Sequence, residues 1–324
     1  MRFAELAEYL EKLEGTASRL EMTRILAELF SKTNPQDARL VAYMTQGRLG
    51  PAYKSPDFGV ADKMMVRALG EGADELFKKT GDLGKTVEEL KSQFSSYKSQ
   101  ASHNLSISQV YKQLVDIALA GGEGSQELKI KLIGELVNQL SGKEAKYAVK
   151  MILGKLRTGF SDMTVLDALS WMIGGDKKLR PEIEDLYNIR ADLGEVAEKV
   201  KRDKGVKGKL GPQMGVPVLM ARCERETSAE EIWERVKPAG AAEYKLDGLR
   251  IQAHVQNSKV TLYSRGLENV TAMYPDVCEG LAKQIKHNCI VEGEMIAVGR
   301  NGRFLPFQET VQRKRKYNIS EMAG

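Results

Sequence analysis

The sequence is poor in the residues that build metal centres and disulfide frameworks. It contains three cysteines and three histidines among 324 residues. Cys223, Cys278 and Cys289 are scattered, and no two of them have the C-x-x-C spacing of a zinc or redox motif. The sequence therefore predicts neither a structural zinc site nor a disulfide-stabilised fold, and such isolated cysteines are typical of proteins in the reducing cytosol.

Long apolar runs are also absent. No stretch approaches the roughly 18 apolar residues of a membrane-spanning helix. Glu5, Glu8 and Glu11 interrupt the first residues, which leaves no apolar core for a secretory signal peptide. Hydrophobic residues still make up 42% of the chain, which is ordinary for a globular protein and excludes wholesale disorder. We therefore expect a cytoplasmic protein without membrane contact, long enough for about two domains.

The net charge is only +5, but the basic residues are unevenly spread. Residues 199–209 hold six lysines or arginines against one aspartate, and residues 313–316 are all basic. Such clusters suit a polyanion, for example a nucleic acid, better than an even distribution would. A solvated linker without a ligand explains basic runs equally well, so the charge pattern alone leaves both interpretations open.

The first two hundred residues have the periodicity of helices. Apolar residues recur at helical spacing in 3–13, 22–30, 129–141, 144–157 and 164–173. Asn34-Pro35 breaks the pattern, and Pro181 suits the first turn of a further helix. We therefore expect residues 1–205 to form an all-helical domain.

Two segments of this helical half share one layout. Each has a helix, a glycine-basic-leucine step, a short loop, and an acidic residue in or beside the next helix. The matching steps are Gly47-Arg48-Leu49 and Gly154-Lys155-Leu156. Helix ends of this kind can present backbone N–H groups and a basic side chain to phosphates, although two ordinary helical hairpins would look the same.

After residue 205 the periodicity changes to that of strands. Apolar and polar residues alternate over 249–256, and 257–259 predict a tight turn into a second strand at 260–264. Residues 289–298 predict another strand, which ends at a glycine-containing turn. We therefore expect residues 206–324 to belong to an α+β domain with antiparallel sheets.

The most informative local pattern is K-x-D-G at residues 245–248, followed by Arg250. In an extended strand Lys245 and Asp247 would point to the same face, and Gly248 would let a ligand approach closely. A lysine beside a carboxylate is a plausible nucleotide-handling pair. The tetrapeptide occurs by accident too often to decide by itself, so its context must be considered.

Two further motifs follow in order. Ser264-Arg265 stands nineteen positions after Lys245, and Glu292-Gly293-Glu294 lies in the next predicted strand. This order resembles that of the covalent nucleotidyltransferases. Upstream, LGPQMGVPVLMARC, KYAVKMILGKLRTGFSDMTVLDALS and YMTQGRLGPAY are similar to segments of ATP-dependent DNA ligases of the archaeal and eukaryotic replicative type. The resemblance covers nearly the whole chain and implies a helical DNA-binding domain followed by part of a nucleotidyltransferase (adenylation) domain.

The resemblance implies the role of the lysine. Lys245 would attack the α-phosphate of ATP, giving a lysine–AMP intermediate and pyrophosphate. A free lysine has a pKa of about 10.4, so nearby cations are needed to favour its neutral amine. Arg250, Arg265 and Mg²⁺ would do this and bind the phosphates. Asp247 would orient the lysine or hold metal-bound water.

Carboxylates complete the implied nucleotide site. Glu294 matches the glutamate that binds the ribose hydroxyls, and Glu243 matches the position that reads the adenine amine. Glu292 stands where the family usually has aspartate, which keeps the carboxylate. Either Asp247 or Glu294 could ligate Mg²⁺, and the resemblance implies that the main metal carboxylate lies beyond Gly324.

The resemblance also implies a substrate. AMP would pass to the 5′-phosphate of a nick in duplex DNA and would then be displaced by the 3′-hydroxyl, steps that depend on positioning and charge neutralisation. The helical half would hold the duplex without reading its sequence. The candidate DNA contacts are Arg48, Lys155, Arg157, Lys204, Lys207 and Lys209.

The implied setting is DNA replication, repair and recombination. The family resemblance implies a monomeric, nucleoid-associated enzyme of the cytoplasm, with an archaeal source. Residues 93–97 lie where related archaeal ligases carry a sliding-clamp-binding loop, although the match is poor. Clamp binding is therefore a hypothesis that the sequence supports only by position.

Parts of the family pattern are missing. The adenine-stacking segment, the E-G-x-M and K-x-K motifs and the OB-fold domain do not occur before the chain stops at NISEMAG, so it looks truncated. We expect these 324 residues by themselves to adenylate poorly or not at all and to be unable to seal nicks. Two alternatives stay open: an RNA ligase or capping-type nucleotidyltransferase, which usually lacks such a helical domain, and a non-catalytic DNA-binding module.

Overall fold

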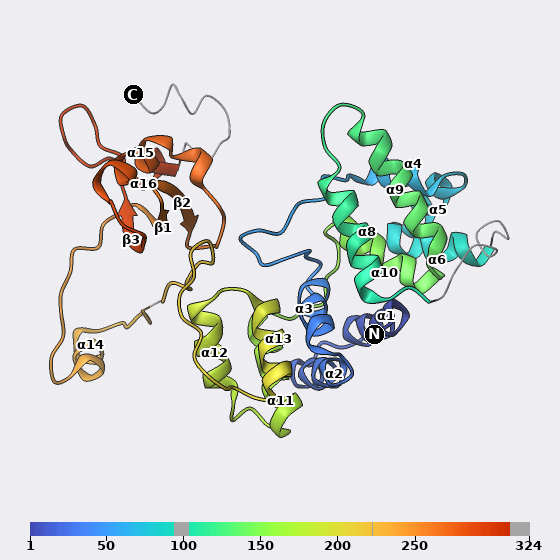
Figure 1. The fold of residues 1–324 in the computed structure, drawn as a ribbon, viewed down its shortest axis with the longest axis horizontal. Coiled ribbons are helices and arrows are strands. Elements are labelled where there is room, and N and C mark those ends of the chain that lie inside the picture. Colours follow the sequence, from blue (N-terminus) through green and yellow to red (C-terminus); the bar gives the residue numbers. More distant parts are fainter. Residues whose placement is uncertain (94–103, 222, 312–324) are drawn as a thin grey trace. The chain divides into compact units, whose positions relative to one another are not determined.

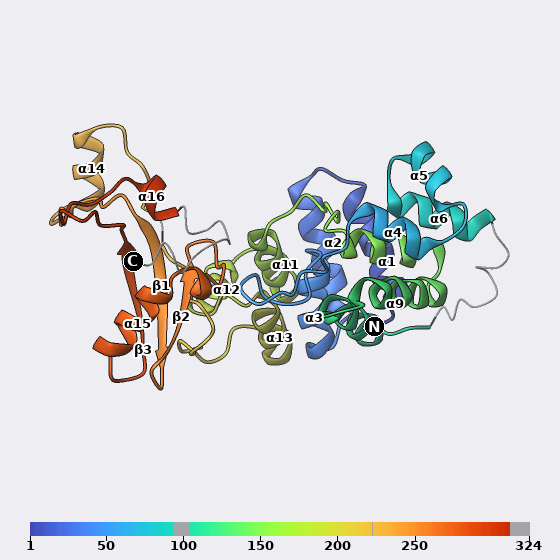
Figure 2. The ribbon, with the colours of Figure 1, turned by 90° about the horizontal axis from the view of Figure 1, so that it is seen from above.

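The computed structural model describes residues 1–93, 104–221 and 223–311, which are coloured in Figures 1 and 2. The chain divides into two compact units. The helical unit comprises Met1–Tyr187 and Ala191–Leu210, and the sheet unit comprises Asn188–Arg190 and Gly211–Gly324. In the described parts of the chain, no helix has both the length and the apolarity needed to cross a membrane.

The helical unit confirms the helices expected from the apolar periodicity. The helices are α1 (Phe3–Glu14), α2 (Arg19–Ser31), α3 (Pro35–Met44), α4 (Asp62–Leu69), α5 (Ala73–Thr80), α6 (Leu83–Gln93), α8 (Ile107–Leu119), α9 (Ser125–Gln139), α10 (Gly142–Ile152), α11 (Asp162–Gly174), α12 (Arg180–Ile189) and α13 (Leu193–Asp203). The helix expected over 144–157 ends earlier, because the chain turns at Gly154, whose φ of 62° favours glycine. Asn34-Pro35 marks a helix start: the Asn34 side chain caps α3.

The packing of α3 against α13 depends on a glycine. Tyr43 of α3 is buried, and its hydroxyl donates a hydrogen bond to Asp192 Oδ1 at 2.6 Å. A Cβ atom at Gly194 would lie 2.3 Å from the Tyr43 ring, so only glycine lets the two helices approach this closely. Burial and the neighbouring Asp192 carboxylate raise the pKa of Tyr43, which therefore remains a neutral donor.

The sheet unit contains three antiparallel strands in the order β2-β1-β3. They are β1 (Leu249–Gln256), β2 (Lys259–Ser264) and β3 (Cys289–Met295), so all three expected strands are confirmed, although β3 stops short of residue 298. Asn257 and Ser258 both have positive φ, as the two central residues of a tight hairpin turn do. The other elements of the unit are α14 (Ala229–Val236), η1 (Thr271–Met273), α15 (Pro275–Gln284) and α16 (Phe307–Val311).

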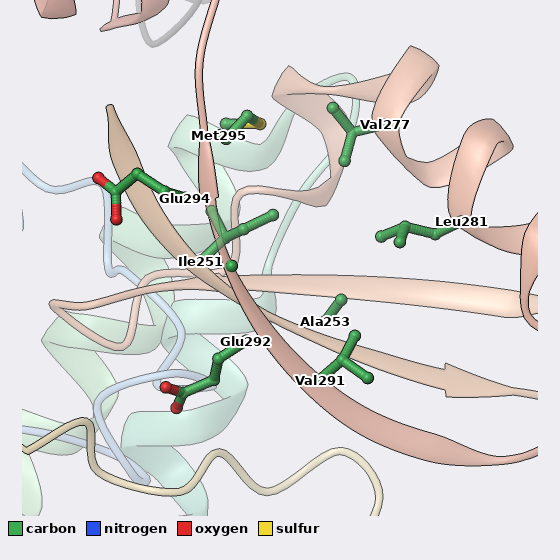
Figure 3. Close-up of a pocket in the computed structure, with 9 residues that line it drawn as sticks. Ile251, Ala253, Val277, Leu281, Val291, Glu292, Glu294 and Met295 are labelled. Atoms are coloured by element: carbon green, nitrogen blue, oxygen red, sulfur yellow. The ribbon is translucent and has the colours of Figure 1, made fainter. Parts of the chain in front are cut away.

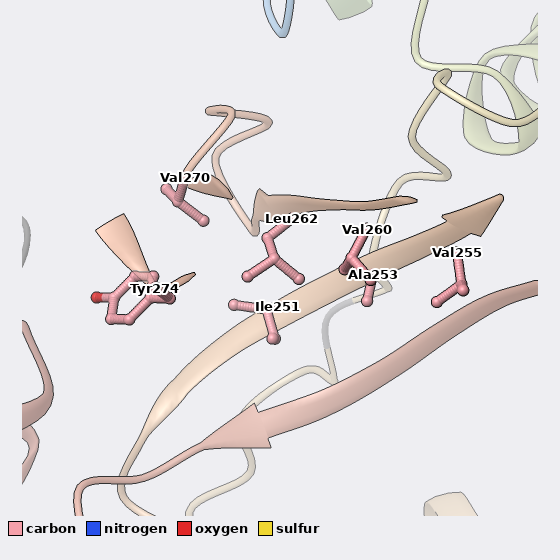
Figure 4. Packing of buried hydrophobic residues seen from close by; sticks show 7 residues of the cluster. All are labelled: Ile251, Ala253, Val255, Val260, Leu262, Val270 and Tyr274. Carbon is pink, nitrogen blue, oxygen red and sulfur yellow. The ribbon is translucent and has the colours of Figure 1, made fainter. Parts of the chain in front are cut away.

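One face of this sheet forms the apolar core of the unit (Figure 4). Ile251, Ala253 and Val255 of β1 pack with residues of β2 and with Val270 and Tyr274. Residues of α15 pack against the same cluster. Because side chains alternate along a strand, residues 250, 252 and 254 point to the opposite face. The core thus fixes which side chains of β1 are available for a site.

Candidate functional site

The second face of the sheet brings predicted nucleotide residues together. Arg250 of β1 is in register with Glu294 of β3, and Gln252 is in register with Glu292. Directly opposed residues of antiparallel strands share a face. Arg250 Nη2 donates a hydrogen bond to Glu292 Oε2 at 2.9 Å. Two predicted site residues, an arginine and a glutamate, therefore stand side by side on this face.

Lys245 lies outside the sheet. Residues 241–247 have no regular secondary structure, and β1 begins at Leu249. The prediction of a strand at Lys245 and Asp247 is therefore wrong. The physical reason is that, among the described residues, no strand pairs with this segment. Glu243, Lys245 and Asp247 are all exposed, and no hydrogen bond or ion pair joins them to another described residue. Their functional groups face solvent.

Gly248 lies directly against the end of β3. A Cβ atom at this position would lie 2.4 Å from the backbone oxygen of Met295 and 3.0 Å from Glu294 Cγ. The glycine of K-x-D-G is therefore required for its close approach to the end of β3, and its role in admitting a ligand stays a prediction. This contact ties the chain three residues after Lys245 to Glu294.

The S-R motif places Arg265 in an exposed turn. Ser264 ends β2 and is paired with Ile251, near the start of β1, so Arg265 and Arg250 lie at the same end of the sheet. The buried Ser264 closes the turn: its N–H donates to Glu268 O at 2.9 Å, and its Oγ accepts from Glu268 N at 3.2 Å. The serine shapes the turn that presents the arginine.

A cavity of about 320 Å³ lies on the other side of the sheet (Figure 3). Its walls include Val277 and Leu281 of α15 and Val291 of β3. Figure 3 shows the carboxylates of Glu292 and Glu294 pointing away from these apolar side chains. The cavity is therefore on the core side, and the charged side chains that could bind a nucleotide face the opposite way.

The two basic steps of the helical unit are cross-paired. Arg48 Nη1 lies 3.8 Å from Asp162 Oδ1, and Lys155 Nζ lies 2.6 Å from Asp62 Oδ1. Asp62 and Asp162 are the first residues of α4 and α11, as the shared layout of the two segments predicts. Partly exposed ion pairs of this kind contribute little stability, so a phosphate can compete for either cation. Arg157 is exposed nearby in sequence.

The basic stretch 199–209 is divided by the structure. Its first part belongs to α13, where Lys199 pairs with Asp203 at 2.7 Å and Lys201 donates to carbonyl oxygens at the end of α2 at 2.8 and 2.9 Å. The first part is thus fixed within the helical unit. Three lysines of this stretch are exposed, and their ammonium groups pair with no side chain among the described residues: Lys204, Lys207 and Lys209.

Two expectations fall outside the described part of the chain. The basic residues 313–316 are not described, and of the clamp-binding hypothesis at 93–97 only Gln93, the last residue of α6, is described. Within the described residues, no group of three or more histidine, cysteine, aspartate or glutamate side chains is placed to hold a metal ion.

Comparison with known proteins identifies the family. The family model "DNA ligase N terminus" matches residues 2–170, and the model "ATP dependent DNA ligase domain" matches residues 217–324. The chain belongs to the ATP-dependent DNA ligase family. The resemblance inferred from the motifs is confirmed, as is the expected fold class of helices followed by an α+β part.

Several curated DNA ligases are similar to this family member. The chain is 40% identical to the DNA ligase of Staphylothermus marinus over 98% of its own length and 57% of that protein. It is 41% identical to DNA ligase 2 of Thermofilum pendens and 40% identical to a probable DNA ligase of Dictyoglomus turgidum, covering 98% and 99% of the chain and 56% of each relative. The chain thus spans about half the length of these curated relatives.

The sequence did not reveal the residues that support Arg250. Gln252 and His254 are buried at 1% and 2% exposure, and Gly215 N donates to His254 Nδ1 at 3.0 Å. The alternating pattern of β1 placed both side chains on the polar face. It did not show that the segment around 215–218, more than thirty residues away in sequence, covers them.

Burial of His254 predicts that the sheet unit of this ligase-family chain loses stability in acid. Desolvation lowers the pKa of His254 below its ordinary value of 6.5. The unfolded chain therefore binds more protons than the folded one between these two values. The contribution of His254 to the free energy of unfolding is fully present above about pH 6.5. It decreases as the pH falls toward the pKa of the folded state, by at most about 1.4 kcal/mol per pH unit.

We expect His254→Gln to flatten this part of the pH dependence. The measurement is the free energy of opening of the β1 amides, by native-state hydrogen exchange, between about pH 7.5 and pH 5.5. His287→Gln, at an exposed position, is the matched control and should leave the wild-type slope unchanged. An identical slope in the wild-type and His254→Gln chains would contradict the expectation.

Proposed function

We propose that this chain is the DNA-holding and lysine-bearing part of an ATP-dependent DNA ligase, which seals nicks in duplex DNA through lysine–AMP and DNA–adenylate intermediates. The observation that carries the proposal is the shared face of Arg250 and Glu294, beside the glycine that anchors the exposed Lys245 segment to β3. In this proposal Arg250 is the cation for phosphate, Glu294 the carboxylate for ribose and Lys245 the nucleophile.

In the proposed first step, the neutral amine of Lys245 attacks the α-phosphate of ATP. A P–N bond forms, the bond to the leaving pyrophosphate breaks, and the amine proton passes to solvent. Arg250 and Arg265 are proposed to bind the phosphates, Glu294 the ribose hydroxyls and Glu243 the adenine amine. These groups position the nucleotide and neutralise charge, which is what phosphoryl transfer requires.

Mg²⁺ is proposed to accompany the nucleotide. Magnesium commonly binds one or two carboxylates together with substrate phosphates, so a cage of three protein ligands is not needed. Asp247 and Glu294 are suitable carboxylates, since the first is exposed near Lys245 and the second shares the face of Arg250. When bound there, the ion would reduce the negative charge of the phosphates.

The helical unit is proposed to hold the nicked duplex. The cross-paired Arg48 and Lys155, together with the exposed Arg157, offer charge to phosphates at two similar helix–loop–helix segments. We further propose residues 1–205 as the DNA-binding domain and 206–324 as the adenylation part. The proposed enzyme is a monomer that acts in replication, repair and recombination. Its proposed location is the cytoplasm of an archaeon, in association with the nucleoid. A sliding clamp is a further proposed partner.

The exposed lysines after α13 give a test of the DNA proposal. Replacing Lys204, Lys207 and Lys209 with glutamine is expected to weaken binding to a nicked duplex and to reduce the slope of log K against log salt. Each phosphate that the protein no longer neutralises lowers the magnitude of this slope by about 0.9. The measurement is a salt titration of fluorescence anisotropy with a labelled nicked duplex.

The matched control is the triple replacement of Lys78, Lys79 and Lys85 with glutamine. It removes the same charge from exposed positions around α5 and α6. An unchanged slope after replacing Lys204, Lys207 and Lys209 would mean that these residues only form a linker. Tighter binding of single-stranded RNA than of the nicked duplex would favour an RNA ligase or capping-type enzyme and contradict the proposed substrate.

A further inference from the structure

A continuous line of hydrogen bonds crosses the polar face of the sheet toward Arg250. Gly215 N donates to His254 Nδ1 at 3.0 Å, and His254 Nε2 lies 2.9 Å from Gln252 Oε1. Gln252 Nε2 donates to Glu292 Oε1 at 2.7 Å, and Arg250 Nη2 donates to Glu292 Oε2 at 2.9 Å. The line begins at the backbone of the 215–218 segment and ends at an arginine that is proposed to bind phosphate.

The partners along this line have consistent donor and acceptor roles. Because Nδ1 of His254 accepts from a backbone N–H, a neutral ring carries its proton on Nε2 and donates to Gln252 Oε1. Desolvation lowers the pKa of His254, which favours this neutral ring. The amide nitrogen of Gln252 is left to donate to Glu292. Each group therefore selects the orientation of the next.

Gln252 has no spare hydrogen-bonding capacity. Its Oε1 also accepts from Val218 N at 2.9 Å, and its Nε2 also donates to Val218 O at 3.1 Å. The side chain is 1% exposed. A buried amide with all of these partners is costly to move, since any other orientation leaves polar groups unsatisfied. Gln252 is thus a fixed point on the face.

We propose that Glu292 and Gln252 are positioning residues that hold the Arg250 guanidinium in place for the nucleotide phosphates; this rests on the proposed function. Glu292 binds Arg250 through one carboxylate oxygen and the fixed Gln252 through the other. The side chain of Arg250 remains 47% exposed, so the held guanidinium can still meet a ligand.

An ordinary surface ion pair would not hold the Arg250 guanidinium in place. Two flexible exposed side chains gain little from pairing, because both must be ordered. Here the carboxylate is already ordered by a buried amide, so the ion pair has to order only Arg250, and it does so before a phosphate binds. A group already held in its bound orientation loses less conformational freedom on binding and improves affinity accordingly.

The decisive variant is Glu292→Gln. Its oxygen can still accept from Gln252 Nε2, but its NH₂ group then faces Arg250 and repels the guanidinium. Gln252→Leu removes the fixed point, and Gln256→Leu is the matched control. Gln256 is the same residue type at the exposed end of the same face of β1. Glu292→Asp restores a carboxylate and is the conservative variant.

The test measures single-turnover labelling of Lys245 by radiolabelled ATP at a series of ATP concentrations. Because the interaction that is removed would be the same in the bound state and during reaction, we expect Glu292→Gln and Gln252→Leu to raise the KM for ATP about tenfold and to change the saturated rate by less than about twofold. Glu292→Asp and Gln256→Leu should stay within about threefold of the wild-type KM.

Hydrogen exchange of the Val218 amide gives a readout that is independent of activity. It should quicken in Gln252→Leu and remain slow in Gln256→Leu and Glu292→Gln. If the wild-type chain labels Lys245 while Glu292→Gln keeps the wild-type KM, the positioning role is overturned and the proposed function stands. A lower saturated rate at unchanged KM also overturns it. If the wild-type chain binds ATP but labels Lys245 too weakly to time, the same variants are compared by their Kd for radiolabelled ATP, and a tenfold rise or its absence has the same meaning. A wild-type chain that does not bind ATP overturns the proposed function, and the positioning role with it.

Discussion

Replacing Lys245 with alanine is expected to reduce the weak covalent AMP labelling expected of the chain to background, while leaving DNA binding and folding unchanged. The proposed reaction needs a neutral amine that forms a P–N bond, and no other atom of the site can substitute for it. The lysine is exposed and has no partner among the described residues, so its removal breaks no described contact. The measurement is gel autoradiography after incubation with α-labelled ATP, alongside anisotropy with a nicked duplex.

Two matched variants separate the nucleophile from its charge. Lys245→Arg keeps a cation but offers a group that stays protonated at any useful pH, so it should also fail to label. Lys259→Ala removes an exposed lysine at the far end of the β1–β2 hairpin and should label like the wild type. Retention of labelling by Lys245→Ala would refute the assignment, even if the amount of label were small.

Much of the fold follows from local patterns. The apolar stripes of α1 and α2 and the turn at Asn257-Ser258 depend on neighbours in sequence, and those patterns predict them well. The end of α10 has a weaker local signal. Helical periodicity continues through 144–157, but the positive φ of Gly154 allows the turn that stops the helix at Ile152. A glycine inside an apolar stripe does not by itself show which outcome occurs.

Only those residues of the candidate site that belong to a linear motif could be predicted from the sequence. Lys245, Arg250 and Glu294 come from linear motifs, whereas the support for Arg250 depends on contacts between 215–218 and β1. Gln252 looks like an ordinary polar residue on the solvent side of a strand, because alternation reports the face and not its covering. Long-range burial of this kind follows from the tertiary arrangement and has no local signature.

Replacing Gly248 with alanine is expected to destabilise the sheet unit and to move the Lys245 segment. The added methyl group would lie 2.4 Å from the backbone oxygen of Met295, which cannot yield without shifting β3. Overpacking of this kind typically costs about 1–3 kcal/mol. The neighbouring Glu294 Cγ at 3.0 Å and Ile296 Cγ1 at 2.8 Å crowd the same space. The lysine would therefore lose its place relative to Glu294.

The control is Gly293→Ala, in the middle of β3, where a Cβ atom would have no neighbour within 4 Å. That change should leave stability within about 0.5 kcal/mol of the wild type. Native-state hydrogen exchange of the β1 and β3 amides measures the difference, and Lys245 labelling reports the effect on the site. Equal stability of the two variants would show that β3 moves aside at little cost. In that case the K-x-D-G glycine would have to be explained by the close approach of a ligand.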